Sequence, residues 1–101
     1  MVCVQVKALR RSGLQIGKWV YLDSEWLGEP GLIEYGDRAV ADRGAIVFGH
    51  LMTHNGKEFA IHFNKVNVGA GAVINARAAV MPGVQIQSGE HVPAGDLRIS
   101  L

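Results

Sequence analysis

The chain has 101 residues, 49% of them hydrophobic, and its ten Lys and Arg nearly balance nine Asp and Glu, which leaves a formal net charge of +1. A chain of this size forms one domain with a core but leaves much apolar surface uncovered, so we expect self-association. The scattered charges exclude the basic field that nucleic-acid binding requires, and no apolar run reaches the length of a membrane span.

Residues 1–15 alternate apolar with other side chains, with Val2, Val4 and Val6 on one side. This alternation predicts a half-exposed strand that caps the first coil. The basic residues of the segment follow its apolar ones, the reverse of a secretory signal. Cys3, the single cysteine, cannot form an internal disulfide and is typical of a reducing compartment. We therefore predict a cytoplasmic protein.

Residues 16–49 place apolar residues six positions apart, and we interpret them as the first coils. The residues are Ile16 and Leu22, and then Tyr35, Ala41 and Val47. A turn cluster from Gly28 to Gly31 separates the two sets and shifts the phase of the repeat. Trp19, Trp26 and Phe48 are expected to fill the first coil or a subunit contact.

Residues 50–65 interrupt the repeat, because the separation of Val47 and Val68 is not a multiple of six. The segment contains polar and aromatic residues and the dipeptide Asn55-Gly56, which is a strong signal for a hairpin turn. We predict a loop excursion here.

The repeat is clearest in residues 66–95. A branched aliphatic residue returns every six positions, at Val68, Ile74, Val80, Ile86 and Val92. A period of six fits neither a helix nor a flat strand, and it predicts very short strands separated by regular corners, which is a β-solenoid. The repeating side chains should point inward and pair one coil away, Val68 with Ile86 and Ile74 with Val92.

Small residues such as Ala72 and Ala78 should let the corners close. A helix over residues 72–80 is the weaker alternative, since alanine favours helix but Pro82-Gly83 and the sustained repeat argue against it. The alternating residues 96–101 form a tail that could cover the open end. The whole chain, residues 1–101, is thus predicted to be a single domain of about five coils.

From Val68 to Val84 the chain resembles the hexapeptide-repeat transferases, whose motif is an aliphatic residue, often followed by glycine, with a small residue at the fifth place. The run from Glu34 to Gly83 is similar to the β-helical segments at the C-terminal end of polylysine-synthetase-type nonribosomal peptide synthetases. The resemblance implies an all-β fold, a left-handed parallel β-helix with one loop excursion, assembled as a homotrimer. In this chain only Ile16, Tyr35 and Val68 are followed by the preferred glycine.

The resemblance also implies an acyltransferase, which moves an acyl group from a coenzyme A or carrier thioester to a small hydroxyl or amine acceptor. Acetyltransferases of this family place a histidine on a loop that leaves the helix, and His50 is the best match. A neutral imidazole can take the acceptor's proton during attack on the thioester. Asp42 and Glu34 are the candidates to orient it. The alternative is a half-buried corner histidine bonded to the backbone.

In the family, acyl-coenzyme A lies along the coils between neighbouring subunits, as a co-substrate and not as a bound cofactor. We assign Lys65, Gly69 and Arg77 to its binding, with the two cations meeting its phosphates. The alternative is that both cations are ordinary surface charges. The run Gly69-Ala70-Gly71 lacks the lysine and the strand-to-helix setting of a phosphate loop, and is interpreted as a corner.

Two other functions stay open. A non-catalytic trimeric scaffold or binding module is the first alternative. The second is a zinc-dependent protein like the gamma-class carbonic anhydrases, with His50, His54 and His62 as ligands; their spacing does not match that family, so no metal ligand is assigned. His91 is predicted to be a solvated corner residue.

Overall fold

The computed structural model describes residues 15–23 and 30–100. Within these ranges the protein is all-β, and its single helical element is the short 3-10 helix η1 (Pro30–Leu32). The strands are β1 (Gln15–Ile16), β2 (Tyr21–Leu22), β3 (Ile33–Tyr35), β4 (Val40–Ala41), β5 (Ile46–Val47), β6 (His50–His54), β7 (Phe59–Phe63), β8 (Val66–Val68), β9 (Val73–Ile74), β10 (Ala79–Val80), β11 (Gln85–Ile86), β12 (His91–Val92) and β13 (Leu97–Arg98). Cys3, Trp26 and most of the predicted N-terminal strand lie outside the described ranges.

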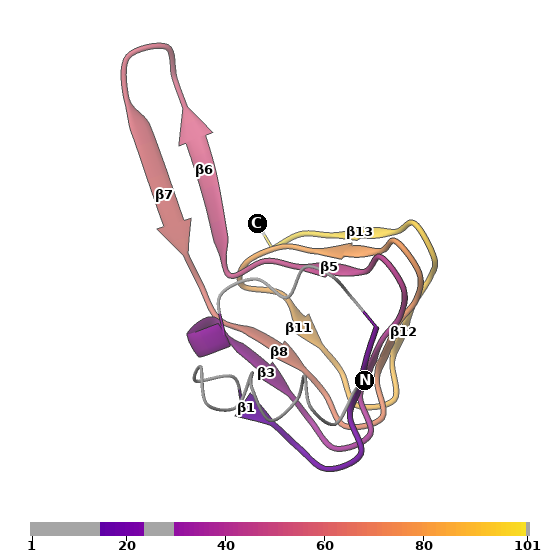
Figure 1. Cartoon of the computed structure of the whole chain (residues 1–101). Coiled ribbons are helices and arrows are strands. Elements are labelled where there is room, and N and C mark those ends of the chain that lie inside the picture. The colour runs from indigo at the N-terminus through magenta and orange to yellow at the C-terminus, as the bar shows by residue number, and fades with distance from the viewer. Residues whose placement is uncertain (1–14, 24–29, 101) are drawn as a thin grey trace.

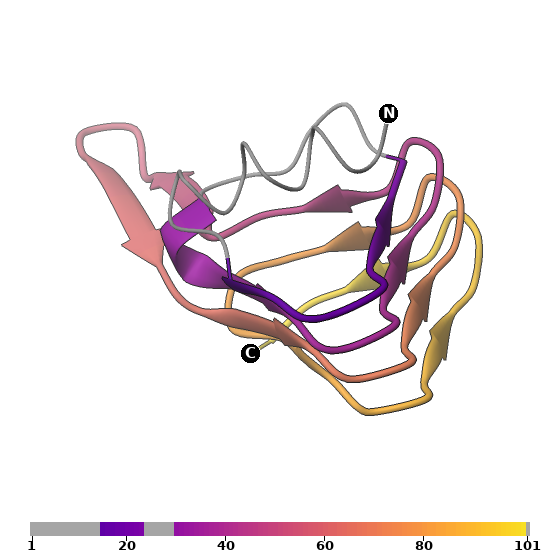
Figure 2. The ribbon, with the colours of Figure 1, turned by 60° about the horizontal axis from the view of Figure 1, so that its bottom comes forward.

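Three parallel sheets carry most of the strands. Sheet A has the order β1-β3-β8-β11, sheet B the order β12-β9-β4-β2 and sheet C the order β13-β10-β5. The chain visits sheets A, B and C in turn, and Figure 1 shows them as the three sides of a roughly triangular body. We call one such passage a level; Figure 2 shows the levels stacked on one another. The arrangement is compatible with the predicted parallel β-helix.

The register of the strands confirms the pairing expected from the six-residue repeat. Val68 is paired with Ile86 in sheet A, and Ile74 with Val92 in sheet B. The repeating side chains point into the body and are at most 3% exposed, namely Tyr35, Ala41, Val47, Val68, Ile74, Val80, Ile86 and Val92. Burial of each such Val or Ile stabilises the fold by roughly 1.5–3 kcal/mol before chain entropy is counted.

The corners between sheets are tight turns closed by a small buried residue. The backbone N–H of Ala72 donates to the carbonyl of Gly69 (3.1 Å), and that of Ala78 donates to Asn75 (3.1 Å). Both alanines are fully buried, as predicted. The equivalent positions of two other corners hold Val20 and Val84, which are buried as well.

Strands β6 and β7 form an antiparallel hairpin that projects from the body (Figure 1). Asn55 makes its turn, because its Oδ1 accepts hydrogen bonds from the backbone N–H groups of Lys57 (3.0 Å) and Glu58 (2.9 Å). Gly56 has a φ of 93°, which L-residues rarely adopt. The hairpin turn predicted at Asn55-Gly56 is therefore confirmed.

Several expectations differ from the structure. The helix considered over residues 72–80 is wrong, because β9 and β10 lie there. Residues 96–100 continue the winding, since Leu97 of β13 pairs in parallel with Ala79. His91 is exposed as expected but lies within strand β12 and not at a corner. The described ranges build sheets of at most four strands, and the number of about five coils stays a prediction because parts of the first coils lie outside these ranges.

Trp19 does not fill the first coil, because its side chain is 84% exposed, and the alternative of a subunit contact stays a prediction. The reason is its place in the repeat: it follows Gly17 and Lys18 in the turn between β1 and β2, where side chains point to solvent. Phe48, by contrast, is partly buried and contacts the ring of His50.

Candidate functional site

His50 begins strand β6 at the root of the hairpin, where the chain leaves sheet C. Its imidazole is partly buried between two aromatic rings, with ring centroids 6.3 Å from Phe48 and 6.3 Å from Phe63, its partner across the hairpin. The hairpin thus holds the imidazole in a defined position next to the body. A half-buried imidazole at a junction of two surfaces is a suitable place for proton transfer.

The two carboxylates considered as partners of His50 are engaged elsewhere. Glu34 lies on sheet A and forms an ion pair with Lys65, with Nζ and Oε1 3.4 Å apart. Asp42 lies at the corner between sheets B and C, where its Oδ1 accepts a hydrogen bond from the backbone N–H of Arg43 (2.7 Å).

The other two hairpin histidines have local partners. His54 stacks on Phe59 with ring centroids 4.3 Å apart, and Nε2 of His62 lies 3.1 Å from the Thr53 hydroxyl. Because successive residues of a strand face opposite sides, His50 and His54 share one face of the hairpin and His62 lies on the other. Within residues 15–23 and 30–100 no three potential ligand side chains gather to hold a metal. The zinc alternative thus gains no support from this part of a single chain.

The three residues assigned to acyl-coenzyme A lie in one level but at different corners of it. Lys65 precedes β8, Gly69 follows β8, and Arg77 lies between β9 and β10. The Lys65 ammonium is paired with Glu34, and the Gly69 N–H donates to the carbonyl of Ile86 (2.8 Å). Arg77 is exposed, with a φ of 60°. One chain therefore does not bring the three together.

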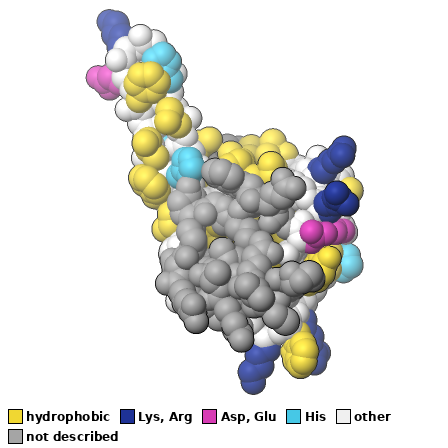
Figure 3. Space-filling model, in the orientation of Figure 1, with side chains coloured by type: hydrophobic (Ala, Val, Ile, Leu, Met, Phe, Trp, Pro, Cys, Tyr) yellow, Lys and Arg dark blue, Asp and Glu magenta, His cyan; other side chains and the backbone are white. Residues whose placement is uncertain are grey.

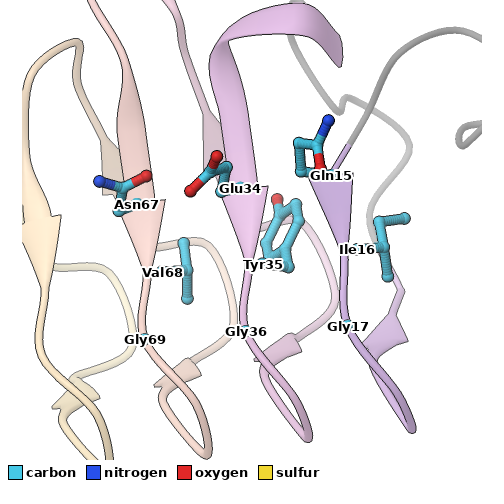
Figure 4. A pocket seen from close by; sticks show the side chains of 9 residues that line it. All are labelled: Gln15, Ile16, Gly17, Glu34, Tyr35, Gly36, Asn67, Val68 and Gly69. Carbon is cyan, nitrogen blue, oxygen red and sulfur yellow. The ribbon is translucent and has the colours of Figure 1, made fainter.

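The outer face of sheet A carries a row of polar side chains, one from each strand. The row is Gln15, Glu34, Asn67 and Gln85. Figure 4 shows the first three of them aligned across the strands, beside a row of Ile16, Tyr35 and Val68 and a row of glycines. Asn67 Nδ2 donates to Gln85 Oε1 (2.7 Å), and Asn67 Oδ1 is buried with no hydrogen-bond partner among residues 15–23 and 30–100.

Sequence reasoning missed this polar row, although a signal for it exists. Each of its members immediately precedes an inward residue of sheet A. The same outward position in sheet B is held by Tyr21, Val40, Val73 and His91, and in sheet C by Ile46, Ala79 and Leu97. Sheet A thus presents a polar outer face, while the outer faces of sheets B and C are mainly apolar.

The hairpin itself is strongly apolar for a surface element. Its large apolar side chains are between 41% and 71% exposed, namely Leu51, Met52, Phe59, Ile61 and Phe63. Figure 3 shows apolar side chains along the whole projection, interrupted by histidine. Four of the five share one face with His50 and His54, because the pairs are His50 with Phe63, Met52 with Ile61, and His54 with Phe59.

A groove separates the hairpin from the body. It is lined by Leu51, Thr53, Ile61, His62, Phe63, Asn64, Met81, Pro82, Ile99 and Ser100. Apolar side chains prevail in its lining, which includes the corner of Met81 and Pro82. Such a groove suits an apolar segment better than a charged ligand.

Comparison with known proteins finds one informative relative. The chain is 30% identical to delta-poly-L-ornithine synthetase of Acinetobacter baumannii over 98 residues, which is 85% of this chain and 7% of that protein. No family model matches the chain. No solved structure matches it either. Among the described residues, no helix is long and apolar enough to cross a membrane. The chain is thus similar to a small part of a poly-amino-acid synthetase.

Proposed function

We propose that this chain is a left-handed, hexapeptide-repeat β-helical module of an acyl-transfer system, in which His50 acts as general base. Three parallel sheets with a six-residue repeat support the fold. The match to part of a polyornithine synthetase supports a biosynthetic role. The observation that carries the proposal is the position of His50 at the root of an exposed apolar hairpin, where its imidazole packs against the rings of Phe48 and Phe63.

The module works as a homotrimer in this proposal. A two-stranded hairpin is at best marginally stable in water by itself, and this one exposes four large apolar side chains on a single face. Packing that face against the apolar outer face of sheet B or C on a second copy buries both surfaces. Such a contact joins two different surfaces, and its repetition forms a ring when the rotation between copies closes; we propose a closed ring of three copies.

A trimer would also complete the site. Lys65, Gly69 and Arg77 lie at three corners of one level, so a donor that meets more than one of them must lie between copies. His50 would then face the thioester from the root of the hairpin. The relative's name contains ornithine, and we propose an amine of a small amino acid as the acceptor.

The reaction balances with groups at hand. His50 takes a proton from the acceptor amine as its nitrogen attacks the thioester carbonyl. The carbon–sulfur bond then breaks, and the imidazolium returns the proton to the leaving thiolate. The products are the amide and the free thiol, and no other reactant is needed.

The direct test incubates the protein with acetyl-coenzyme A and L-ornithine and measures acetyl-ornithine by mass spectrometry. Wild-type protein should form the amide, and His50→Gln, which keeps a polar side chain of similar size, should lower the rate by roughly 10²–10⁴-fold. His62→Gln, on the opposite face of the hairpin, is the matched control and should retain the rate. Equal rates for wild type and His50→Gln would remove the base assignment.

A non-catalytic trimeric scaffold is the second candidate, and it is favoured by the aromatic packing around His50 and the separate engagement of Glu34 and Asp42. A wild-type trimer without turnover on hydroxyl and amine acceptors would select it. The cytoplasmic location stays a prediction, and either function is compatible with it.

A further inference from the structure

Each corner between two sheets is a tight turn with two central residues. The second of these two residues adopts a left-handed backbone conformation. In the described ranges these positions have φ values from 59° to 85°. Five of them are glycines, as sterics favour, namely Gly44, Gly71, Gly83, Gly89 and Gly95. The three others are Trp19, Arg38 and Arg77. A left-handed φ is unfavourable for a residue with a Cβ, so these three side chains are retained at a cost to stability.

Two of the three exceptions are neighbours. The turn of Trp19 lies directly against the turn of Arg38, because the backbone N–H of Arg38 donates to the carbonyl of Lys18 (2.8 Å). In the next level the equivalent residue is Gly71, whose N–H donates to the carbonyl of Asp37 (2.8 Å). One corner therefore carries an indole and two cations in adjacent turns, followed by a turn that is nearly free of side chains.

These residues line a surface hollow of about 400 Å³, together with Asp37, Ala70 and Gly71. The Trp19 side chain is 84% exposed, and Lys18 and Arg38 are exposed as well. Asp37 brings one negative charge, but its Oδ1 accepts a hydrogen bond from the backbone N–H of Lys18 (2.7 Å), which holds the carboxylate against the turn. The corner has a net positive charge, because the two cations Lys18 and Arg38 outnumber the single carboxylate of Asp37.

An exposed indole offers a flat surface for stacking, and neighbouring Lys and Arg side chains bind phosphate. We propose that the corner of Lys18, Trp19 and Arg38 binds a nucleoside phosphate, with the base stacked on Trp19 and the phosphates between the two cations. This site lies at the corner between sheets A and B, which also carries Gly69, whereas His50 leaves sheet C, so it does not depend on the assignment of His50 as general base. The ligand is either a free nucleotide or the nucleotide half of coenzyme A, which share this chemistry.

The test is isothermal titration of the full chain with ADP, adenosine and pyrophosphate as probes. ADP should bind saturably, and adenosine and pyrophosphate, which each lack one half of the recognised chemistry, should bind at least tenfold more weakly. Trp19→Gly should lower the ADP affinity by roughly tenfold or more, because base–aromatic stacking is lost. Circular dichroism should show the fold unchanged, since glycine suits this φ, as at the equivalent Gly71.

Arg38→Gly should also weaken ADP and should reduce the dependence of the affinity on salt. Arg43→Ala removes an exposed arginine at another corner and is the matched control, with ADP affinity unchanged. His50→Gln should bind ADP like wild type, which separates this site from the acyl-transfer site.

Coenzyme A distinguishes the two sources of the ligand. Binding of coenzyme A as tight as that of ADP, with the same loss in Trp19→Gly, identifies a coenzyme A site; binding of ADP alone identifies a free nucleotide. The proposal is overturned if ADP gives no saturable binding, if Trp19→Gly binds ADP like wild type, or if only coenzyme A binds.

Discussion

Gly36 is required because a Cβ would have no room there, and not because its backbone adopts a left-handed φ. A Cβ on Gly36 would lie 2.6 Å from the backbone nitrogen of Ala70 in the next level. Gly17 and Gly69 stand at the same corner, and a Cβ on Gly69 would lie 2.5 Å from the backbone nitrogen of Ser88. The glycine that follows Ile16, Tyr35 and Val68 is therefore explained by the backbone of the following level.

Substitution Gly36→Ala should destabilise the protein by about 1–3 kcal/mol, because the clash is with backbone that cannot rotate away. Gly31→Ala is the matched control, since nothing lies within 4 Å of a Cβ there. Chemical denaturation followed by circular dichroism measures both. Equal stabilities for the two variants would contradict the explanation.

Among the described residues Tyr35 is the largest fully buried side chain, and none of these residues forms a hydrogen bond with its hydroxyl. An unpaired buried hydroxyl is unfavourable, so Tyr35→Phe should raise the free energy of unfolding by roughly 1 kcal/mol. Loss of stability in Tyr35→Phe would instead indicate a hydrogen bond to this hydroxyl. Denaturation at pH 7 decides between the two.

Burial raises the pKa of the Tyr35 phenol well above its usual range. The folded protein then keeps the proton at a pH where the unfolded chain loses it, so stability should fall as the pH rises above about 10. In Tyr35→Phe this part of the alkaline decline should be absent. Melting temperatures between pH 8 and pH 11 for both proteins measure the difference, and parallel curves would speak against it.

At the scale of single elements, β13 differs from the strands on which it stacks. In sheet C the inward position is held by Val47, then Val80, and in β13 by Arg98. The arginine stem covers the interior, and its guanidinium binds Glu90 Oε2 (2.6 Å) and Asp96 Oδ2 (2.9 Å). This element thus replaces apolar packing with two partly exposed ion pairs.

The pH dependence of this cluster follows from its pKa shifts. A hydrogen bond from the Gln87 backbone and then Arg98 lower the pKa of Glu90, and Arg98 lowers the pKa of Asp96. Carboxylates with a lowered pKa stabilise the fold above about pH 4, and this contribution is lost as the pH falls through their folded pKa values.

Arg98→Met, which keeps the apolar stem, should therefore lower the melting temperature slightly at pH 7, and the difference from wild type should vanish near pH 2. Arg43→Met, at an exposed corner, is the control and should change neither value. A difference that persists at pH 2 would assign the effect to packing and not to charge.

At the scale of the whole molecule, the body and the hairpin of β6 and β7 differ in how much apolar surface they expose. The body buries most of its repeating residues, whereas the hairpin exposes most of its large apolar side chains. Sheet A presents polar residues outward, and sheets B and C present mainly apolar ones. Covering of the hairpin by another copy, as in the proposed trimer, would remove this apolar surface from water.

The double variant Phe59→Ser, Ile61→Ser should therefore dissociate the proposed trimer into monomers while the body stays folded. Ala60→Ser, on the opposite face of the hairpin, is the control and should remain trimeric. Light scattering on a sizing column measures the mass, and circular dichroism measures the fold. A monomeric wild type, or a trimeric double variant, would contradict assembly through this face.

Within each regular stretch the sequence by itself determined the inward residues, which recur at a spacing of six, and in residues 66–95 it also determined their register, Val68 with Ile86 and Ile74 with Val92. Across residues 28–31 and the hairpin, where this spacing breaks, the tertiary structure set the register. The turn at Asn55-Gly56 was equally readable, because it depends on local chemistry. His50 was placed at the start of the interruption, but its packing between Phe48 and Phe63 depends on which residues the hairpin pairs.

Only the tertiary structure decided which residues lie together at the same corner of the body. Lys65, Gly69 and Arg77 are close in sequence, yet successive corners separate them around one level. Lys18 and Arg38 are 20 positions apart, and stacking of adjacent levels brings them together beside an exposed Trp19. The physical reason is that the repeat encodes which side chains turn inward, whereas outward neighbours arise from the stacking of whole levels, which no local pattern records.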